Sequence, residues 1–465
     1  MARQVSGKRA LSRIIDETPR PVYLVDATRR LLFCNDACLT WLNLTESEVV
    51  GMTCRYHAVA LADTKPWDGL CPPPAAFGAE STHGTIWYDA NGQRSYREVQ
   101  FLKLSDQPDV LVAIAATDAS TNPPGLPPAG ATRDPDHLHT QLIHFAAGRN
   151  RTNASDQLVG VSPAIRRVRR QFELACQNGT ATLVTGPPGS ECNQLLRAIA
   201  AARALTDAAR LLPIDCSLLD AELFESVLMP QIEHAVSTTA GRVQILLFDV
   251  DRLPQPVQPL LVALLEDSVG LAADVMATAE CSLENVDSYD RRLREHLSVL
   301  TLQLPPLVDR LEDVPLLAQN FVELLNADAA IEKSVGGFSP EAMDRLVNHS
   351  WKRNIDELRE VVSAAFARCD SSLIQIRHLP ERLTLAADAE LYPLNPPETI
   401  QLDEYLQSIE KELLERALRV ANGNRAQAAR LLGIPRVRLL RRLEAAGLAV
   451  RPDIPFIPVD DESTE

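Results

Sequence analysis

Short apolar or mixed apolar and polar runs, separated by turn residues, dominate the first part of the chain. They lie at residues 21–26, 30–34, 84–88, 96–101 and 110–116. Runs of this length predict strands, and the last three, with a turn at Asn91-Gly92, predict a closing antiparallel sheet. A helix is expected from Asn35, after the second strand. The pattern therefore predicts a small α+β domain over residues 10–118.

The middle of the chain carries the pattern of an α/β fold. The apolar run Thr182–Thr185 predicts a strand, residues 186–193 follow as a loop, and Gln194–Ala202 predicts a helix. A second buried strand, Val243–Phe248, ends at Asp249. Strand, loop and helix in this order are typical of nucleotide-binding units. We therefore expect an α/β core here.

The C-terminal part has a helical pattern. From Glu404 to Ala421, apolar residues recur at helical spacing and predict a long amphipathic helix. Arg425–Leu432 predicts a short helix with small packing alanines, Gly433 a turn, and Pro435 the start of another helix, where its missing N–H is not needed. This order predicts a helix-turn-helix domain over residues 400–451.

Two Pro/Gly-rich stretches separate these parts. Residues 121–132 lie within a linker that we place at 119–156, and a second stretch lies at 392–398. Because such stretches hold neither helix nor sheet, they predict domain boundaries. The expected architecture is a multi-domain α/β protein with a C-terminal helical bundle.

Composition narrows the class of protein. The chain has 465 residues, 46% of them apolar, and a net charge of −16, which argues against general adhesion to nucleic acid or membranes, so any DNA contact must be local. The sequence contains neither an apolar run that could cross a bilayer nor a signal-peptide core, so we expect a cytoplasmic protein. Nine scattered cysteines without a C-x-x-C pair argue against a disulfide framework or structural zinc. Cys54, His57 and Cys71 are too irregularly spaced to predict a metal or haem site.

Residues 186–193, called the phosphate loop below, have the frame of a phosphate-binding motif. Such a motif needs glycines, which let backbone N–H groups approach the phosphates, and a lysine to meet their charge. Gly186 and Gly189 are present, but Glu191 stands where a glycine belongs and Cys192 stands where the lysine belongs. A cysteine at a helix N-terminus can become reactive, but the neighbouring carboxylate opposes this, so an inert Cys192 is favoured over a redox sensor.

Stretches beyond the phosphate loop carry a family resemblance. They are Leu158–Ala164, Ile214–Ser217, Glu222–Phe224, Leu304–Leu307 with Arg310–Leu317, and Trp351–Leu358. In this order the block resembles the AAA+ domain of NtrC-like, sigma-54-dependent transcription activators. The resemblance implies an α/β core over residues 157–320 and a helical lid over residues 321–390.

The two flanking parts resemble other modules. Residues 10–118, with Asp26, the Asn35-x-Ala37 step and Glu48–Gly51, resemble a PAS domain, which is a sensory or dimerisation module. Gly423–Leu443 resembles the Fis-type helix-turn-helix with which NtrC-like activators end.

The chain departs from the family at several positions of the nucleotide site. Val250 stands where a second acid after Asp249 would help to hold Mg²⁺. The resemblance places the polar sensor at Glu280, the sensor arginine at Asp356, and an arginine finger at Arg294. Residues 225–231 also lack the Gly-Ala-Phe-Thr-Gly-Ala loop that contacts the sigma factor, so contact with sigma-54 is in doubt.

These changes remove positive charge and add carboxylates where a triphosphate would lie. Each like-charge contact at ~4 Å costs on the order of a kcal/mol or more, even when screened. We therefore expect a pseudo-ATPase with absent or very weak ATP binding, no hydrolysis, no catalytic residue, no cofactor and no metal. The alternative is a variant site that still binds nucleotide.

Arginines mark the predicted helix-turn-helix as the DNA-binding part. From Arg425 to Arg451 there are seven arginines and one acid, Glu444. The planar guanidinium group pairs with guanine edges or phosphate oxygens, and the second helix would enter the major groove. The alternative is a solvated basic face, and the agreement between turn, packing and charge favours DNA binding. The predicted DNA-binding residues are Arg425, Gln427, Arg430, Arg436, Arg438, Arg441 and Arg442.

Three functions are compatible with the sequence. The favoured one is a DNA-binding transcription regulator with a PAS input domain and a non-hydrolysing AAA+ core; the others are an ATP-driven sigma-54 activator and a pure interaction scaffold. The expected partners are duplex DNA, a second copy of the chain through the long C-terminal helix or a higher homo-oligomer, and RNA polymerase or a partner regulator. No membrane partner is expected.

Overall fold

The computed structural model describes residues 15–58, 64–90, 93–104, 107–122, 133–148, 158–204, 210–238, 242–267, 273–286, 289–328, 333–381, 383, 402–421, 423–446 and 448. The chain divides into two compact units, residues 1–388 and 389–465. The predicted stretch 121–132 is described only at its first two residues, and the stretch 392–398 and the turn Asn91-Gly92 lie outside the described residues.

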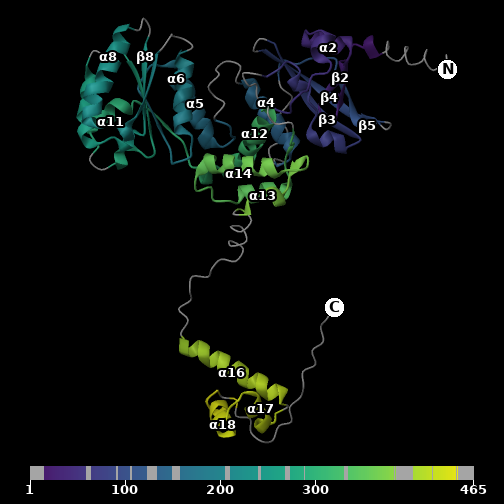
Figure 1. Cartoon of the computed structure of the whole chain (residues 1–465), viewed down its shortest axis with the longest axis vertical. Coiled ribbons are helices and arrows are strands. Elements are labelled where there is room, and N and C mark those ends of the chain that lie inside the picture. Colours follow the sequence, from purple (N-terminus) through teal and green to yellow (C-terminus); the bar gives the residue numbers. More distant parts are fainter. Residues whose placement is uncertain are drawn as a thin grey trace, which may run out of the picture. The chain divides into compact units, whose positions relative to one another are not determined.

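A five-stranded antiparallel sheet forms the PAS-like domain, in the order β2-β1-β5-β4-β3 (Figure 1). Its strands are β1 (Val22–Asp26), β2 (Leu31–Cys34), β3 (Ser81–Ala90), β4 (Gln93–Leu104) and β5 (Gln107–Ala115). Between β2 and β3 lie α2 (Asp36–Leu42), α3 (Glu46–Val49), η1 (Asp68–Leu70) and η2 (Pro74–Gly78). Asn35 caps α2, because its Oδ1 accepts hydrogen bonds from the N–H groups of Cys38 and Val22. The predicted sheet and the predicted helix after Asn35 are both present.

A five-stranded parallel sheet forms the α/β core, in the order β10-β6-β9-β8-β7. Its strands are β6 (Thr182–Thr185), β7 (Arg210–Asp215), β8 (Val243–Phe248), β9 (Ala273–Ala279) and β10 (Leu300–Gln303). Its helices of nine or more residues are α5 (Pro163–Gln177), α6 (Cys192–Ala204), α8 (Met229–Thr238) and α9 (Gln258–Glu266), and α11 (Arg291–Leu297) is shorter.

Helices cover both faces of this sheet. Ile245 and Leu247 of β8 belong to an apolar cluster with α8, α9 and α11, whereas Leu246 and Phe248 belong to a second cluster with α5 and α6. Figure 1 shows the two layers on opposite sides of β8. Because both faces are buried, every residue of the strand except Gln244 is apolar, which is why the sequence predicted it correctly.

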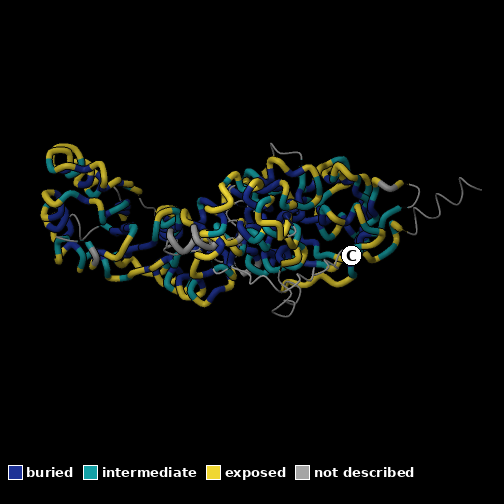
Figure 2. Tube along the Cα trace, turned by 90° about the horizontal axis from the view of Figure 1, so that it is seen from below, coloured by how far each residue is buried: buried dark blue, intermediate teal, exposed yellow. Residues whose placement is uncertain are grey.

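The lid is built around a buried central helix. It comprises η9 (Leu307–Asp313), α12 (Val314–Ala327), β11 (Gly337–Phe338), α13 (Pro340–Val347), α14 (Asn354–Arg368), β12 (Leu373–Ile374) and η10 (Ile376–His378). Most residues of α12 are buried, as expected for a helix with neighbours on several sides. In Figure 2 the buried positions of the described chain are dark blue.

Helix α4 (Pro135–Gly148) is an element that the sequence patterns did not predict. It lies within the range 119–156 assigned to a linker. Leu138, Leu142 and Ile143 of α4 are buried in the same apolar cluster as α12, so α4 packs on the lid.

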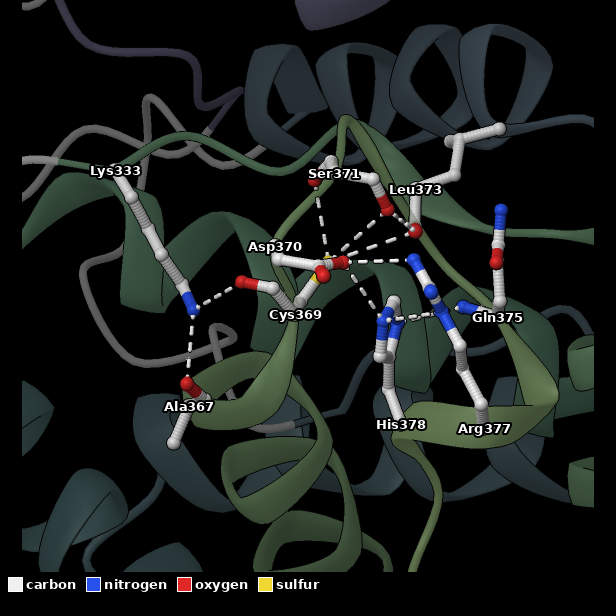
Figure 3. Close-up of polar contacts among 9 residues, drawn as sticks. All are labelled: Lys333, Ala367, Cys369, Asp370, Ser371, Leu373, Gln375, Arg377 and His378. Carbon is white, nitrogen blue, oxygen red and sulfur yellow. Dashed lines mark hydrogen bonds and ion pairs between the residues drawn. The ribbon is translucent and has the colours of Figure 1, made fainter.

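A polar cluster holds the C-terminal end of α14 (Figure 3). Lys333 Nζ donates to the carbonyl oxygens of Ala367 at 3.2 Å and Cys369 at 2.9 Å, where a cation complements the helix dipole. Arg377 donates to Asp370 at 2.9 Å, and its guanidinium lowers the pKa of that carboxyl. These contacts fix α14, whose other end faces the phosphate loop.

The C-terminal unit is a small helical domain with a core of its own. It contains α16 (Leu402–Val420), α17 (Arg425–Leu431) and α18 (Arg436–Ala445). Gly433 connects α17 and α18 at a φ of +64°, a left-handed conformation that suits glycine. Pro435 is the N-cap of α18, which therefore begins one residue later than predicted. The buried core residues are Leu414, Ala417, Ala421, Ala428, Ala429, Leu439 and Leu443.

Candidate DNA interface and nucleotide site

The phosphate loop connects β6 to α6, and the lid lies directly on it. Asn354 Nδ2 donates to the Pro188 carbonyl at 2.7 Å, and the Asp356 N–H donates to the Gly189 carbonyl at 3.3 Å. Gly189 has a φ of +78°, and a Cβ at this position would lie 2.1 Å from the Arg353 carbonyl oxygen. Glycine is therefore needed here for close contact with the lid.

Glu191 makes an ion pair with Arg359 of the lid helix α14. The Glu191 side chain is only 7% exposed, whereas Arg359 is 48% exposed. Glu191 also has a φ of +66°, a left-handed conformation that glycine adopts easily and that strains a residue with a Cβ. The pair thus places a cation beside the phosphate loop but neutralises it with a carboxylate from the loop itself.

A small cavity is lined by residues of both the phosphate loop and the lid. Its volume is about 10 Å³. A volume of that size accommodates roughly one water molecule and no phosphate group. Its lining residues are Leu158, Ser190, Glu191, Leu195, Leu304, Arg310 and Ile355.

Cys192, at the lysine position, begins α6 and packs close to Gly186. A Cβ on Gly186 would lie 2.9 Å from the Cys192 sulfur. Burial raises the pKa of the Cys192 thiol to about 12, and the carboxylates Asp249 and Glu280 act in the same direction. The side chain is therefore a neutral thiol near pH 7, which disfavours a redox-sensing role.

Asn193, the last residue of the phosphate loop, is a site residue that sequence reasoning did not single out. In working loops a Ser or Thr hydroxyl at this position contacts Mg²⁺. Here Asn193 Oδ1 accepts a hydrogen bond from Thr278 Oγ1 at 2.7 Å. Thr278 is on β9, and a long-range partner of this kind leaves no signal in the local sequence.

The acidic residues Asp249 and Glu280 of the site are close together but have different partners. Asp249 follows β8 with a φ of +54°, and its N–H donates to Thr278 Oγ1 at 3.1 Å. Burial raises the pKa of Asp249, with Asp251 and Glu280 acting in the same direction and Arg252 opposing them. Glu280 pairs with Arg252. Val250 is fully buried in the core, so it is a packing residue.

Arg294, the candidate arginine finger, lies on α11. It lines a separate hollow of about 550 Å³ that includes Ser298 and Gln303 but no residue of the phosphate loop. Thr185, which directly precedes the phosphate loop, also lines this hollow.

The segment after Glu222 is helical throughout. Helix α7 (Ala221–Leu223), the π-helix η5 (Phe224–Leu228) and α8 follow one another without an inserted loop. Residues 225–231, where the family's sigma-contact loop was sought, lie within this run.

The predicted DNA-binding residues lie on the surface of the helix-turn-helix unit. Arg425, Gln427 and Arg430 are exposed on α17. Arg436, Arg438, Arg441 and Arg442 are exposed on α18, while Leu439 and Leu443 of the same helix are buried. At about 100° per residue, Arg438 and Arg441 lie roughly opposite this buried stripe. These two arginines are therefore best placed to reach a groove.

Two exposed residues of α18, Arg442 and Val437, have contrasting surroundings. Arg442 makes a 2.9 Å ion pair with Glu410 of α16, so it also contributes to helix packing. Val437 is 66% exposed beside the outer arginines. A valine in this position could contact a thymine methyl group.

The described part of the chain offers no group of three or more His, Cys, Asp or Glu residues arranged to hold a metal ion. Within the same residues, every helix is too short or too polar to cross a membrane.

Comparisons with known proteins match the lid and the C-terminal unit. Residues 308–391 match the AAA+ ATPase lid domain, and residues 405–445 match the Fis family of bacterial regulatory proteins. The transcriptional regulatory protein ZraR of Escherichia coli is 29% identical over 309 residues, which cover 62% of this chain and 68% of ZraR. The alginate biosynthesis transcriptional regulatory protein AlgB of Pseudomonas putida is 32% identical over 250 residues, or 48% of this chain and 54% of AlgB. A crystal structure of NtrX from Brucella abortus in complex with ATP aligns with a TM-score of 0.41 and 24% identity, over 67% of this chain and 75% of NtrX.

The fold and these matches define a multi-domain transcription regulator with a PAS-like domain, an AAA+ core with its lid, and a Fis-type helix-turn-helix. The matched lid and helix-turn-helix, together with the similarity to ZraR, indicate the family of NtrC-like, sigma-54-dependent transcription regulators. The predicted family and fold class are confirmed.

Proposed function

We propose that this chain is a sequence-specific DNA-binding regulator whose AAA+ core does not hydrolyse ATP. In this proposal residues 10–118 form the domain that receives a signal, and residues 119–156 link it to the AAA+ part. Residues 157–320 form the α/β core and residues 321–390 form the lid. Residues 400–451 bind duplex DNA. The carrying observation is the outer face of α18, where Arg438, Arg441 and Val437 are exposed on a helix whose other side is buried. Phosphate contacts from the remaining arginines would fix the orientation on the duplex.

The loss of ATP chemistry is supported by the phosphate loop. A neutral thiol replaces the lysine, and Glu191 pairs with the lid cation Arg359. A bound triphosphate would have to displace this pair while facing Asp249 and Glu280. Electrostatic repulsion from these carboxylates therefore opposes binding.

Loss of sigma-54 contact and formation of a dimer complete the proposal. The helical run from α7 to α8 leaves no inserted loop to reach a sigma factor. On α16, Leu413 and Val420 are 51% and 64% exposed, which supports pairing with a second copy through this helix. RNA polymerase or a partner regulator remains the expected output partner.

Two measurements on the full chain test this function. Selection from a random duplex library, followed by fluorescence anisotropy, should yield one enriched motif that binds at least ~1,000-fold more tightly than unrelated DNA. Titration calorimetry with Mg-ATP should give no heat of binding, and a phosphate-release assay should give no turnover. Turnover that depends on the chain would favour the ATP-driven activator, and absence of any enriched motif would favour a pure interaction scaffold.

A further inference from the structure

The lid and the PAS-like domain share a single buried core. Ala58, Trp87 and Tyr96 of the PAS-like domain lie in one apolar cluster with α4 and with Leu317, Phe321 and other residues of the lid. The remainder of the PAS-like domain has a separate cluster. The lid is therefore packed against the sensory domain and does not depend on the α/β core alone for its position.

Glu323 of α12 is the polar centre of this contact. Its side chain is fully buried, and its Oε2 accepts a 2.8 Å hydrogen bond from the Ala58 N–H of the PAS-like domain. Its Oε1 lies 2.8 Å from His139 Nδ1 of α4 and accepts a 3.0 Å hydrogen bond from Gln319. A carboxylate without these partners would be costly to bury, so Glu323 fixes α12 relative to both neighbours.

Contacts on either side of Glu323 hold the same PAS segment. Arg55 Nη1 donates to the Ala327 carbonyl at the end of α12 at 2.9 Å. The Tyr56 ring stacks on His139 with centroids 4.3 Å apart. Arg94 Nη1 donates to the Ala58 carbonyl at 2.7 Å. Residues 55–58, called the PAS contact segment below, therefore have a defined position against α12.

The same helix reaches the phosphate loop through a neighbouring residue. Phe321, two positions before Glu323, lies under the Arg359 guanidinium, 5.0 Å from its ring centroid. Arg359 in turn pairs with Glu191 of the phosphate loop. A chain of direct contacts thus runs from Ala58 through Glu323, α12, Phe321 and Arg359 to Glu191.

We propose that α12 relays the state of the PAS contact segment to the phosphate loop, with the Glu191–Arg359 pair standing where a nucleotide would otherwise link lid and core. Glu323 is a positioning residue in this relay. The inference rests on the proposed loss of ATP binding, because a bound nucleotide would compete for Arg359. A displacement of residues 55–58 then shifts α12 and alters how firmly the lid holds the phosphate loop.

Hydrogen exchange measured by mass spectrometry on the full chain tests the relay. Glu323→Gln keeps the side-chain volume but removes one acceptor, so it should raise exchange in a peptide covering 186–195 by about five-fold, within the range for coupled sites. Glu360→Gln is the matched control, because Glu360 pairs with Arg353 on the exposed side of α14. It should leave this peptide unchanged. If Glu323→Gln does not fold, His139→Asn removes the opposite partner.

The double variant Glu323→Gln/Arg359→Gln decides whether the effect travels through Arg359. If the relay operates, Glu323→Gln has little further effect on hydrogen exchange in the 186–195 peptide once Arg359 has been replaced. Additive effects, a rise confined to residues 54–58 and α4, or an equal rise in β7 and β8 would each overturn the proposal. Mg-ATP calorimetry on the same sample tests the proposed function separately. ATP binding would refute that function without changing the hydrogen exchange of the single and double variants, which is measured without nucleotide.

Discussion

At the residue scale, Glu191 combines a strained backbone with a favourable side-chain contact. Its φ of +66° is a conformation that costs a non-glycine residue roughly 1–2 kcal/mol. Its ion pair with the half-exposed Arg359 returns no more than about 1 kcal/mol, because solvent screens an exposed guanidinium. The side chain at this position is therefore not explained by stability alone, and a role in holding the lid accounts for it better.

Two substitutions at Glu191 separate strain from pairing. Glu191→Gly loses the pair but relieves the backbone, so its stability should stay within ~1 kcal/mol of the parent. Glu191→Ala loses the pair and keeps the strain, so it should be about 1 kcal/mol less stable than Glu191→Gly. Urea denaturation of the full chain measures both. Equal stability of the two variants would show that the left-handed backbone carries no strain.

The raised pKa of Cys192 predicts how its reactivity depends on pH. Because burial favours the neutral thiol and raises the pKa to about 12, the thiolate population stays small at pH 8 and grows only as the pH approaches 12. Alkylation by iodoacetamide at pH 8 should therefore modify the exposed Cys281 well before Cys192. Peptide mass spectrometry over a pH series checks the order, with Cys281→Ser as control. Fast labelling of Cys192 at pH 8 would restore the redox alternative.

At the scale of the element, α18 divides its arginines between two tasks. Arg438 and Arg441 face away from the buried Leu439 and Leu443, whereas Arg442 pairs with Glu410 of α16. A helix with a buried stripe presents only its outer third to a groove, so neighbouring residues of one type need not share a function.

This division predicts unequal effects of alanine substitutions. Arg441→Ala and Arg438→Ala should each weaken binding to the selected duplex by about 1–3 kcal/mol if they contact base edges. Arg442→Ala should weaken it less and should cost the isolated C-terminal unit up to about 1 kcal/mol of stability, as expected for an exposed ion pair. Fluorescence anisotropy and thermal unfolding give the two quantities. The assignment would fail if Arg442→Ala had the largest effect on DNA binding.

The sequence predicted elements whose signal is local and missed contacts whose signal is not. The apolar run Val243–Phe248 and the glycine turn at Gly433 each specify their own geometry. Helix α4 was missed because its apolar residues follow a Pro/Gly stretch and find their partners in the lid. The Glu191–Arg359 pair joins residues 168 positions apart. The sequence showed that a carboxylate at position 191 is unusual for a phosphate loop, but it held no local signal that identifies Arg359 as the partner.

At the scale of the whole molecule, the apolar clusters of the described residues do not coincide with the domains. The α/β core has a cluster on each face of its sheet, and the C-terminal unit has one of its own. The PAS-like domain, by contrast, contributes to two clusters, one internal and one shared with α4 and the lid. Stability of the lid should therefore depend on the PAS-like domain.

Conservative substitutions in the two clusters of the PAS-like domain test this dependence. Trp87 belongs to the shared cluster and Phe101 to the internal one, and both are nearly fully buried. Trp87→Phe and Phe101→Leu each remove buried volume and should cost about 1–3 kcal/mol. Because only Trp87 touches the shared core, Trp87→Phe should raise hydrogen exchange in α12, whereas Phe101→Leu should raise it only within the PAS-like sheet. Mass spectrometry of peptides from residues 314–327 measures the difference, and unchanged exchange in α12 of Trp87→Phe would mean that the lid holds its position without the PAS-like domain.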